Sequence, residues 1–255
     1  MPFADLHTAR IRYRETGAPR PGAPVLFIHG AGGSSAIWLT SLHRLGRHRR
    51  AVALDLPGHG RSTGSAETFD DLLGAVGATA ATLCLGRSIL VGHSLGGLVA
   101  IAAALAFPDK VAGLVLVTSA SRFSVSPRLL DVLENHFGRW PDFLAEMGFS
   151  PSTSADTRRR AASLAAQADQ KQTLTDFQIC TTRDATSQLG DLRAPTLIIS
   201  GADDLLCPPK WGDVLEAGIP GSRRVQLARC GHFPMFERPD EYGDLLVDFV
   251  ASQAG

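Results

Sequence analysis

The sequence contains little that would indicate a nucleic-acid partner, a disulfide framework or a membrane span. Its 25 Lys and Arg residues balance its 25 Asp and Glu residues, so the formal net charge is zero and no basic surface is indicated. The four cysteines are scattered without a C-x-x-C pair, which is typical of reduced thiols in a cytoplasmic protein. The longest apolar stretch, about residues 97–107, is far shorter than the ~20 residues of a membrane helix. We therefore expect a soluble, cytoplasmic protein that binds neither nucleic acid nor a membrane.

The sequence also lacks the common motifs that hold metals and nucleotides. It has no H-E-x-x-H pair, no P-loop and no cluster of cysteine and histidine, so we expect no metal and no cofactor. One rival pattern is HGAGG (residues 29–33), which together with Asp55 resembles part of a dinucleotide fingerprint. Ser35 stands where the third glycine would fall, and two strand-like segments precede the loop. NAD binding is therefore the weaker interpretation of these glycines.

Short apolar runs alternate with helical segments along most of the chain. At 255 residues and 44% apolar composition, the chain is long enough to bury a large core in a single domain. Apolar runs of strand length between helices are typical of a parallel sheet with helices on both faces. A weakly alternating segment at residues 3–15 predicts two short strands or a hairpin before them. The predicted buried strands are residues 25–28, 51–54, 89–91, 113–117, 196–199 and 224–227.

The pattern changes between about residues 121 and 189, where strand-like runs are missing and apolar residues recur at helical spacing. Helices are predicted there over residues 156–169 and 174–184, among others. We interpret this segment as a helical cap or lid inserted into a core formed by residues 1–120 and 190–255. Its run of three arginines at residues 158–160 is interpreted as a solvated helix face.

The strongest chemical signal lies in residues 88–107. A buried strand there is followed by GHSLG (residues 92–96), a G-x-S-x-G signature, and then by an Ala- and Leu-rich helical segment. This order is the context of a nucleophile elbow, a sharp turn that exposes the serine. Glycines suit positions 92 and 96 because a Cβ atom there would collide with neighbouring backbone. Ser94 is therefore the predicted nucleophile, with the following helix N-terminus favouring negative charge nearby.

A serine hydroxyl needs a base, and the base needs an orienting carboxylate. Asp203 and Asp204 follow one predicted strand and His232 follows the next, and catalytic groups gather at the carboxyl ends of strands in open α/β sheets. The chain order of serine, acid and histidine is that of the α/β-hydrolase triad.

Along the whole chain, the motifs HGAGG, DLPGHGRS, GHSLGG, GADDLLCPP and CGHFPMFERPD resemble the successive motifs of capped α/β-hydrolases of the esterase and C–C hydrolase type. The resemblance implies an α/β-hydrolase fold, with a mostly parallel central sheet of about eight strands flanked by helices and an inserted helical cap. It also implies a serine hydrolase that works through an acyl-enzyme.

The resemblance also selects the triad acid. In this family the acid commonly lies in a G-x-x-D-x-x-x-P pattern, and Gly201 and Pro208 align that pattern on Asp204 rather than Asp203. Another family position for the acid, after the strand that ends near residue 117, is held here by Thr118-Ser119. Asp204 is therefore the expected acid.

The base and the oxyanion hole follow from the same motifs. His232 matches the family base, and the family's oxyanion hole is built from backbone N–H groups that map to Leu95 and Ala31. A bulky aromatic side chain belongs more often to the core than to a pocket. The aromatic residues that we consider as pocket candidates are Trp38, Phe123, Phe137, Trp140 and Phe233.

The histidines next to glycine are expected to be structural. His29 and His93 are predicted to hold loop backbone in place, and His59 to organise its loop with Asp55 and Arg61.

The predicted function is hydrolysis of carboxylic esters of small to medium hydrophobic substrates. A C–C bond hydrolase of vinylogous diketones is an alternative, although such relatives usually carry Asn where His93 stands. Lactonase and perhydrolase activities use the same triad and stay open, as does a ligand receptor built on the hydrolase fold. Oligomeric state is not indicated by the sequence.

Overall fold

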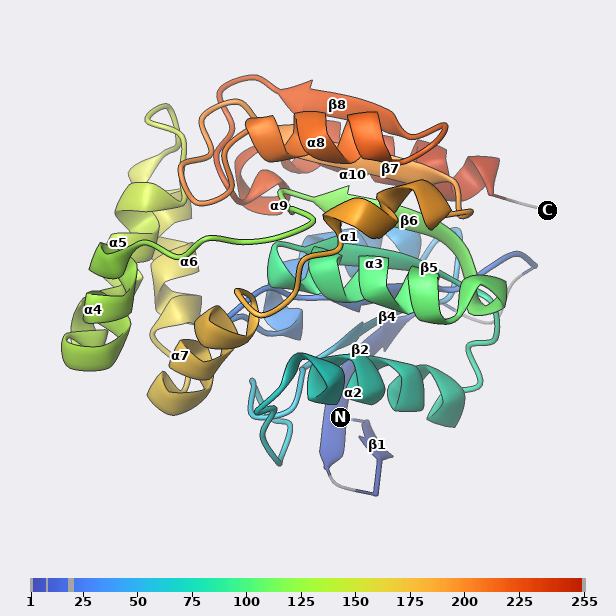
Figure 1. Ribbon diagram of the computed structural model, residues 1–255, viewed down its shortest axis with the longest axis horizontal. Coiled ribbons are helices and arrows are strands. Elements are labelled where there is room, and N and C mark those ends of the chain that lie inside the picture. The colour runs from blue at the N-terminus through green and yellow to red at the C-terminus, as the bar shows by residue number, and fades with distance from the viewer. Residues whose placement is uncertain (1, 8, 18–20, 254–255) are drawn as a thin grey trace.

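A mostly parallel sheet runs through the middle of the computed structural model, which describes residues 2–7, 9–17 and 21–253 (Figure 1). Within these residues the sheet has eight strands in the order β1-β2-β4-β3-β5-β6-β7-β8. Only the pairings of β2 with β1 and with β4 are antiparallel. The predicted α/β architecture is therefore confirmed. The strands are β1 (Phe3–Asp5), β2 (Arg10–Thr16), β3 (Val25–Ile28), β4 (Ala51–Leu54), β5 (Ser88–His93), β6 (Val111–Val117), β7 (Thr196–Gly201) and β8 (Arg223–Leu227).

The N-terminal segment forms the predicted hairpin, in which Phe3 of β1 pairs with Arg12 of β2. Residue 8, between these strands, lies outside the described residues. The same holds for residues 1, 18–20, 254 and 255, which the predicted core ranges include.

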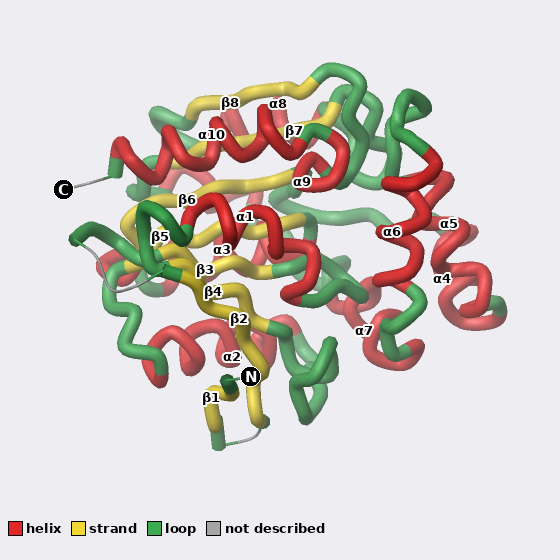
Figure 2. The backbone as a smooth tube through the Cα atoms, turned by 180° about the vertical axis from the view of Figure 1, so that it is seen from behind, coloured by secondary structure: helices red, strands yellow, loops and turns green. Residues whose placement is uncertain are grey.

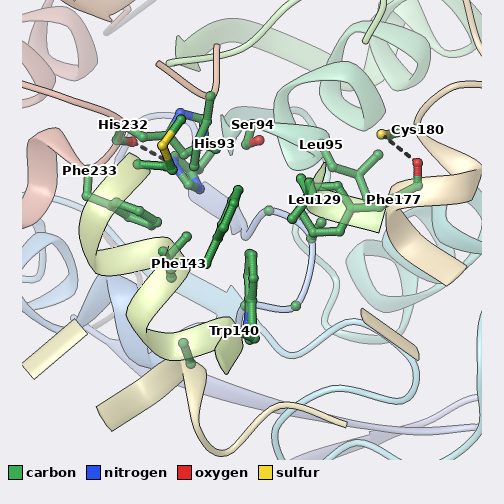
Figure 3. Close-up of a pocket in the computed structure, with 18 of the residues that line it drawn as sticks. His93, Ser94, Leu95, Leu129, Trp140, Phe143, Phe177, Cys180, His232 and Phe233 are labelled. Carbon is green, nitrogen blue, oxygen red and sulfur yellow. Dashed lines mark hydrogen bonds between the residues drawn. The ribbon is translucent and has the colours of Figure 1, made fainter. Parts of the chain in front are cut away.

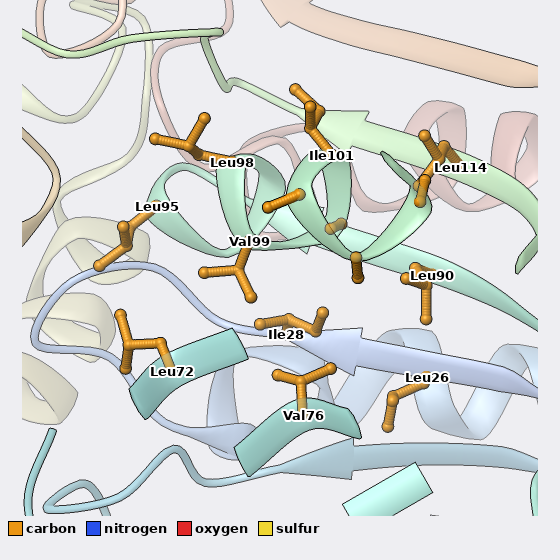
Figure 4. Packing of buried hydrophobic residues seen from close by; sticks show 14 of the residues in the cluster. Leu26, Ile28, Leu72, Val76, Leu90, Leu95, Leu98, Val99, Ile101 and Leu114 are labelled. Carbon is orange, nitrogen blue, oxygen red and sulfur yellow. The ribbon is translucent and has the colours of Figure 1, made fainter. Parts of the chain in front are cut away.

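The central strands are apolar because helices cover both faces of the sheet. Alternate side chains of a strand point to opposite faces, so Leu26 and Ile28 of β3 join one hydrophobic cluster while Val25 and Phe27 join another. Figure 4 shows the first cluster, where α2 and α3 pack on β3. From behind, Figure 2 shows α1 and α10 over the opposite face. The flanking helices are α1 (Leu39–Leu45), α2 (Phe69–Thr82), α3 (Leu95–Ala106), α8 (Lys210–Gly218), α9 (Pro234–Glu237) and α10 (Pro239–Ser252).

None of the helices in the described ranges is both long and apolar enough to cross a bilayer.

Residues 121–189, between β6 and β7, are hereafter called the helical insert. They form α4 (Pro127–Asn135), α5 (Trp140–Met147), α6 (Ala155–Ala165) and α7 (Gln170–Ile179), which lie together at one end of the sheet (Figure 1). The two ends of the insert meet at an isolated antiparallel β-bridge between Arg122 and Asp184.

The last two helices of the insert begin and end earlier than predicted. α6 ends at Ala165, and α7 covers Gln170–Ile179 instead of residues 174–184. The Asp169 side chain accepts a hydrogen bond from the N–H of Gln172 at 2.8 Å and so caps the start of α7. The expected boundary was wrong because Asp169 acts as a cap and not as the end of the preceding helix.

Candidate active site

Ser94 occupies the sharp turn between β5 and α3. Its backbone has φ 52° and ψ −121°, a left-handed conformation that a non-glycine residue rarely adopts. The turn brings the strand end and the helix start so close that a Cβ atom on Gly92 would overlap the carbonyl of Gly96. A Cβ atom on Gly96 would likewise overlap the carbonyl of Ile28 in β3. The two glycines therefore permit the turn that presents Ser94.

The segment after β6 supports this turn. The N–H of Ser94 donates to the carbonyl of Val117 at 3.0 Å, and the Ser119 hydroxyl donates to the carbonyl of Ser94 at 2.7 Å. The Thr118 hydroxyl donates to the carbonyl of His232 at 2.9 Å. Thr118 and Ser119 thus hold the backbone of the expected nucleophile and base.

His232 and Asp204 form a buried pair at the ends of β8 and β7. His232 Nδ1 lies 2.8 Å from Asp204 Oδ2, while Asp204 Oδ1 accepts hydrogen bonds from the N–H groups of Leu206 and Cys207 at 2.9 and 2.8 Å. A carboxylate can only accept, so Nδ1 carries a proton, and in the neutral ring the lone pair is then on Nε2. Asp203 instead accepts a hydrogen bond from Ser150 of the insert at 2.6 Å.

His93 packs against His232 as a buried, neutral ring. Its Nε2 donates to the carbonyl of His232 at 2.9 Å, and the two imidazole centroids are 4.7 Å apart. Burial, and then the proximity of His232, hold the pKa of His93 well below its usual value. The His93 ring therefore places no positive charge beside His232 near neutral pH.

The loop after β3, residues 29–33, packs directly against the serine. A Cβ atom on Gly30 would lie 2.9 Å from the Cβ of Ser94. The carbonyl of Gly30 accepts hydrogen bonds from the N–H of Gly33 at 3.0 Å and from His29 Nδ1 at 2.8 Å. His29 Nε2 in turn accepts from the N–H of Leu56 at 3.0 Å. Burial and the neighbouring His59 lower the pKa of His29 to about 4, so this ring is also neutral.

Ser94, His232, Ala31 and Leu95 all line one cavity of about 230 Å³. Figure 3 shows Trp140 of the insert across this cavity from Ser94. None of the described residues around it is Lys, Arg, Asp or Glu, so its walls carry no permanent charge. Most of its lining is apolar, including Leu129, Phe143, Leu144, Met147, Leu164, Phe177, Leu205, Leu206 and Phe236.

Three of the five predicted pocket aromatics line this cavity, namely Phe123, Trp140 and Phe233. Trp38 and Phe137 do not, which corrects their predicted placement. Trp38 is fully buried between the sheet and α1, with its ring 4.9 Å from that of Phe27. Phe137 is half-buried against the core of the insert. Both side chains bury apolar surface in a hydrophobic cluster and do not line the cavity.

Sequence reasoning missed Asp176, which lies on α7 and is fully buried. Asp55 does hold Arg61, accepting from its N–H at 3.1 Å, but the His59 ring turns to Asp176 at 2.7 Å. The signal for a buried polar contact was the set Gln172, Thr173 and Asp176, which share one side of a helix. The predicted helix began only at residue 174 and left out the first two, whereas α7 begins at Gln170.

Glu237 in α9 is a second residue that sequence reasoning missed. Its carboxylate accepts hydrogen bonds from the N–H groups of Gly231 and Phe233 at 3.0 and 3.1 Å. It also accepts from the N–H of Ser150 at 2.8 Å. Glu237 therefore fixes both neighbours of His232 and ties them to the insert. The motif FERPD contains this residue but does not indicate its partners.

The chain belongs to the alpha/beta hydrolase family, whose model matches residues 25–245. The predicted family, fold and enzyme class are therefore confirmed.

Individual relatives resemble the chain over nearly its full length. A pimeloyl-[acyl-carrier protein] methyl ester esterase of Photobacterium profundum is 31% identical over 252 residues, which cover 90% of this chain and 95% of that protein. The enol-lactonase of Burkholderia xenovorans has a similar structure with a TM-score of 0.89 and 24% identity, covering 98% of this chain and all of that one. A thermophilic esterase of Thermogutta terrifontis gives a TM-score of 0.87 and 24% identity, covering 97% and 95%.

Proposed function

We propose that the protein hydrolyses carboxylic esters of small to medium hydrophobic substrates through an acyl-enzyme. The observation that carries this proposal is the convergence of Ser94, the Asp204–His232 pair and an uncharged, apolar cavity. A neutral acyl or alcohol group loses no charge solvation on entering such a cavity, whereas an ionised group would enter without a counter-ion.

The reaction proceeds in two half-steps at Ser94. His232 Nε2 takes the hydroxyl proton as the oxygen attacks the ester carbonyl, and Asp204 holds the His232 tautomer that makes this possible. The N–H groups of Ala31 and Leu95 stabilise the oxyanion. His232 then gives its proton to the departing alkoxide, which leaves as an alcohol. In the second half-step His232 deprotonates a water that attacks the acyl-enzyme, and it then returns this proton to the Ser94 oxygen as the acyl–oxygen bond breaks and the carboxylic acid leaves.

The helical insert acts in this proposal as a cap that determines which substrates fit. Its helices α4, α5, α6 and α7 all contribute apolar side chains to the cavity wall, while the reacting groups come from the sheet. The binding of the hydrophobic group and the chemistry at Ser94 are thus assigned to different parts of the chain.

The relatives support ester hydrolysis in general. The Photobacterium relative is named as a methyl ester esterase and covers almost the whole chain. C–C hydrolases usually carry Asn where His93 lies, and here His93 donates to the carbonyl of His232.

The test is hydrolysis of p-nitrophenyl esters from acetate to dodecanoate by the wild type and by Ser94→Ala. We expect multiple turnover by the wild type with an optimum at intermediate chain length. The substitution should lower kcat on the order of 10⁶-fold. A Ser94→Ala protein that keeps more than about a hundredth of the wild-type rate would contradict the role of Ser94. Stoichiometric cleavage without turnover would support the receptor alternative instead.

A matched pair of substrates tests the uncharged cavity. The p-nitrophenyl ester of valerate and the mono-p-nitrophenyl ester of glutarate have equal chain lengths, but the second ends in a carboxylate. We expect kcat/KM to be at least about 10-fold lower for the glutarate ester, because no cation among the described lining residues can pair with it. Equal values would show that the hydrophobic group binds elsewhere.

A further inference from the structure

The helix α7 presents a buried polar face to the catalytic half of the molecule. Gln172, Thr173 and Asp176 have exposed fractions of 6%, 0% and 0%, although they belong to the insert and not to the sheet core. Residues at these spacings share one side of a helix. Gln172 exchanges hydrogen bonds with the backbone of Ala66 at 3.0 and 3.2 Å, and a Cβ atom on Gly32 would lie 2.7 Å from Thr173. The face is therefore in close contact with the loops beneath it.

Each of the two carboxylate oxygens of Asp176 accepts a hydrogen bond. Its Oδ2 accepts from the N–H of Gly32 at 2.9 Å and faces His59 Nε2 at 2.7 Å. Its Oδ1 accepts from Gln172 Nε2 at 3.1 Å. A buried carboxylate is tolerated only when it is paired and hydrogen-bonded, and Asp176 meets both conditions. Its partners include one backbone group of the loop that carries Ala31.

His59 is the cation of the ion pair with Asp176. Both of its ring nitrogens face acceptors, because Nδ1 lies 2.9 Å from the carbonyl of Pro57 and Nε2 faces Asp176. Only the imidazolium form has two N–H donors. Burial opposes that charge, but Asp176, aided by Asp55, outweighs it and raises the pKa of His59. The neutral His29 ring, 4.8 Å away, adds no competing positive charge near neutral pH.

The geometry fixes the peptide planes on both sides of Ala31. The carbonyl of Gly30 and the N–H of Ala31 belong to one planar unit, and that carbonyl is held by His29 and Gly33. The next unit carries the N–H of Gly32, which is held by Asp176. With both planes fixed, the direction of the Ala31 N–H is fixed as well.

We propose that Asp176 is a positioning residue, which uses its ion pair with His59 to lock the oxyanion loop in place. The inference rests on the proposed function, because Ala31 is an oxyanion donor only in that reaction. It makes the oxyanion hole depend on the docking of α7, so that an element of the insert completes a catalytic feature of the core.

The test compares Asp176→Asn with Asp169→Ala. In the wild type each carboxylate oxygen of Asp176 accepts a hydrogen bond, one from Gly32 and one from Gln172. An asparagine amide would therefore place its NH₂ group against one of these donors in either orientation. We expect kcat per active site, counted by titration with a p-nitrophenyl phosphonate, to fall by about 10- to 100-fold while KM changes by less than about 3-fold. Asp169→Ala removes only the exposed cap of the same helix. It should lower the melting temperature and leave kcat per active site within about 2-fold.

A second measurement separates positioning from mere stability. An alkyl boronic acid forms a tetrahedral adduct with a catalytic serine and so probes the oxyanion hole. Its inhibition constant should rise about 10-fold in Asp176→Asn but not in Asp169→Ala. If Asp176→Asn instead lowers only the titrated fraction and the melting temperature, Asp176 is structural and the proposal is overturned.

A milder variant covers the case in which Asp176→Asn does not fold. His59→Gln keeps one donor for Asp176 but no charge, and its kcat should fall by about 3- to 10-fold. An unchanged kcat there overturns the proposal. Failure of the proposed function is distinguishable from these results, because it would appear as residual turnover by Ser94→Ala or as no turnover by the wild type.

Discussion

The sheet core and the helical insert hold the same cavity by different means. In the core, the backbone leaves no space, since Cβ atoms on Gly92, Gly96 or Gly201 would overlap neighbouring carbonyl groups. In the insert, single polar side chains reach across to the core, as Asp176 does to Gly32 and Ser150 does to Asp203. Backbone packed this closely cannot shift to accept an added side chain, whereas each side-chain hydrogen bond of the insert can be removed by a single substitution.

The insert makes such contacts at both edges of the cavity. Near Gly32 it uses α7, and near His232 it uses residues 148–150. There the N–H of His232 donates to the carbonyl of Gly148 at 2.8 Å, next to the contact of Ser150 with Glu237. The cap proposed for substrate selection therefore also touches the backbone of both halves of the reacting site. Substitutions at these glycines of the core should lower the free energy of unfolding strongly. Removal of a single hydrogen bond of the insert should lower it less.

The largest effect is expected from Gly96→Ala. The added Cβ atom would overlap the carbonyl groups of Ile28 and His29, which are backbone and cannot move aside. We expect the free energy of unfolding to fall by about 3 kcal/mol or more, measured by denaturant titration. Gly77→Ala on the exposed side of α2 is the control, because nothing lies within 4 Å of its Cβ. That control should stabilise by about 0.5–1 kcal/mol, and similar losses in both variants would refute steric placement.

The next effect concerns the neutral histidines of the core at acid pH. The pKa of His29 is lowered from 6.5 to about 4, so the unfolded chain binds a proton in this range that the native protein does not. Stability therefore falls as pH decreases from about 6.5 to about 4, by about 3 kcal/mol for His29 alone. His93 acts in the same direction. His59, whose pKa is raised, adds stability that is complete below about 6.5 and is lost as pH rises through its folded value.

Denaturant titrations between pH 7 and pH 4 measure this dependence. His29→Gln is the matched control, because an amide can accept from Leu56 and donate to Gly30 without titrating. Its stability should fall less steeply with acid than that of the wild type. Equal slopes would mean that His29 does not contribute to the acid sensitivity.

The smallest effect is expected from Ser150→Ala in the insert. The substitution removes the hydroxyl that donates to Asp203 at 2.6 Å but keeps the backbone N–H that donates to Glu237. Asp203 is only half-buried and can bind water instead, so unfolding should become easier by about 1 kcal/mol. Chemical denaturation checks this value. A loss as large as that of Gly96→Ala would show that the insert, too, is placed by interactions that cannot be removed singly.

Much of the fold could be predicted because its signals are local. Residues 25–28 and 51–54 are short and wholly apolar, and they form β3 and β4 with those bounds. The spacing of Gly92, Ser94 and Gly96 likewise located the sharp turn. Trp38 was misplaced because the sequence does not distinguish a large aromatic side chain of the core from one that lines a pocket. Its burial against Phe27 places it in the core.

Short stretches of sequence are enough to predict the alternation of strands and helices, the turn at Ser94 and the candidate residues at the strand ends, because each of these signals lies within a few neighbouring positions. The polar groups that meet across the cavity are known only from the folded chain. Asp176 and Gly32 are 144 residues apart in the chain, and Asp176 and His59 are 117 apart. Their contact depends on how α7 docks on two loops, and the hydrophobic pattern of α7 carries no information about a partner on another element.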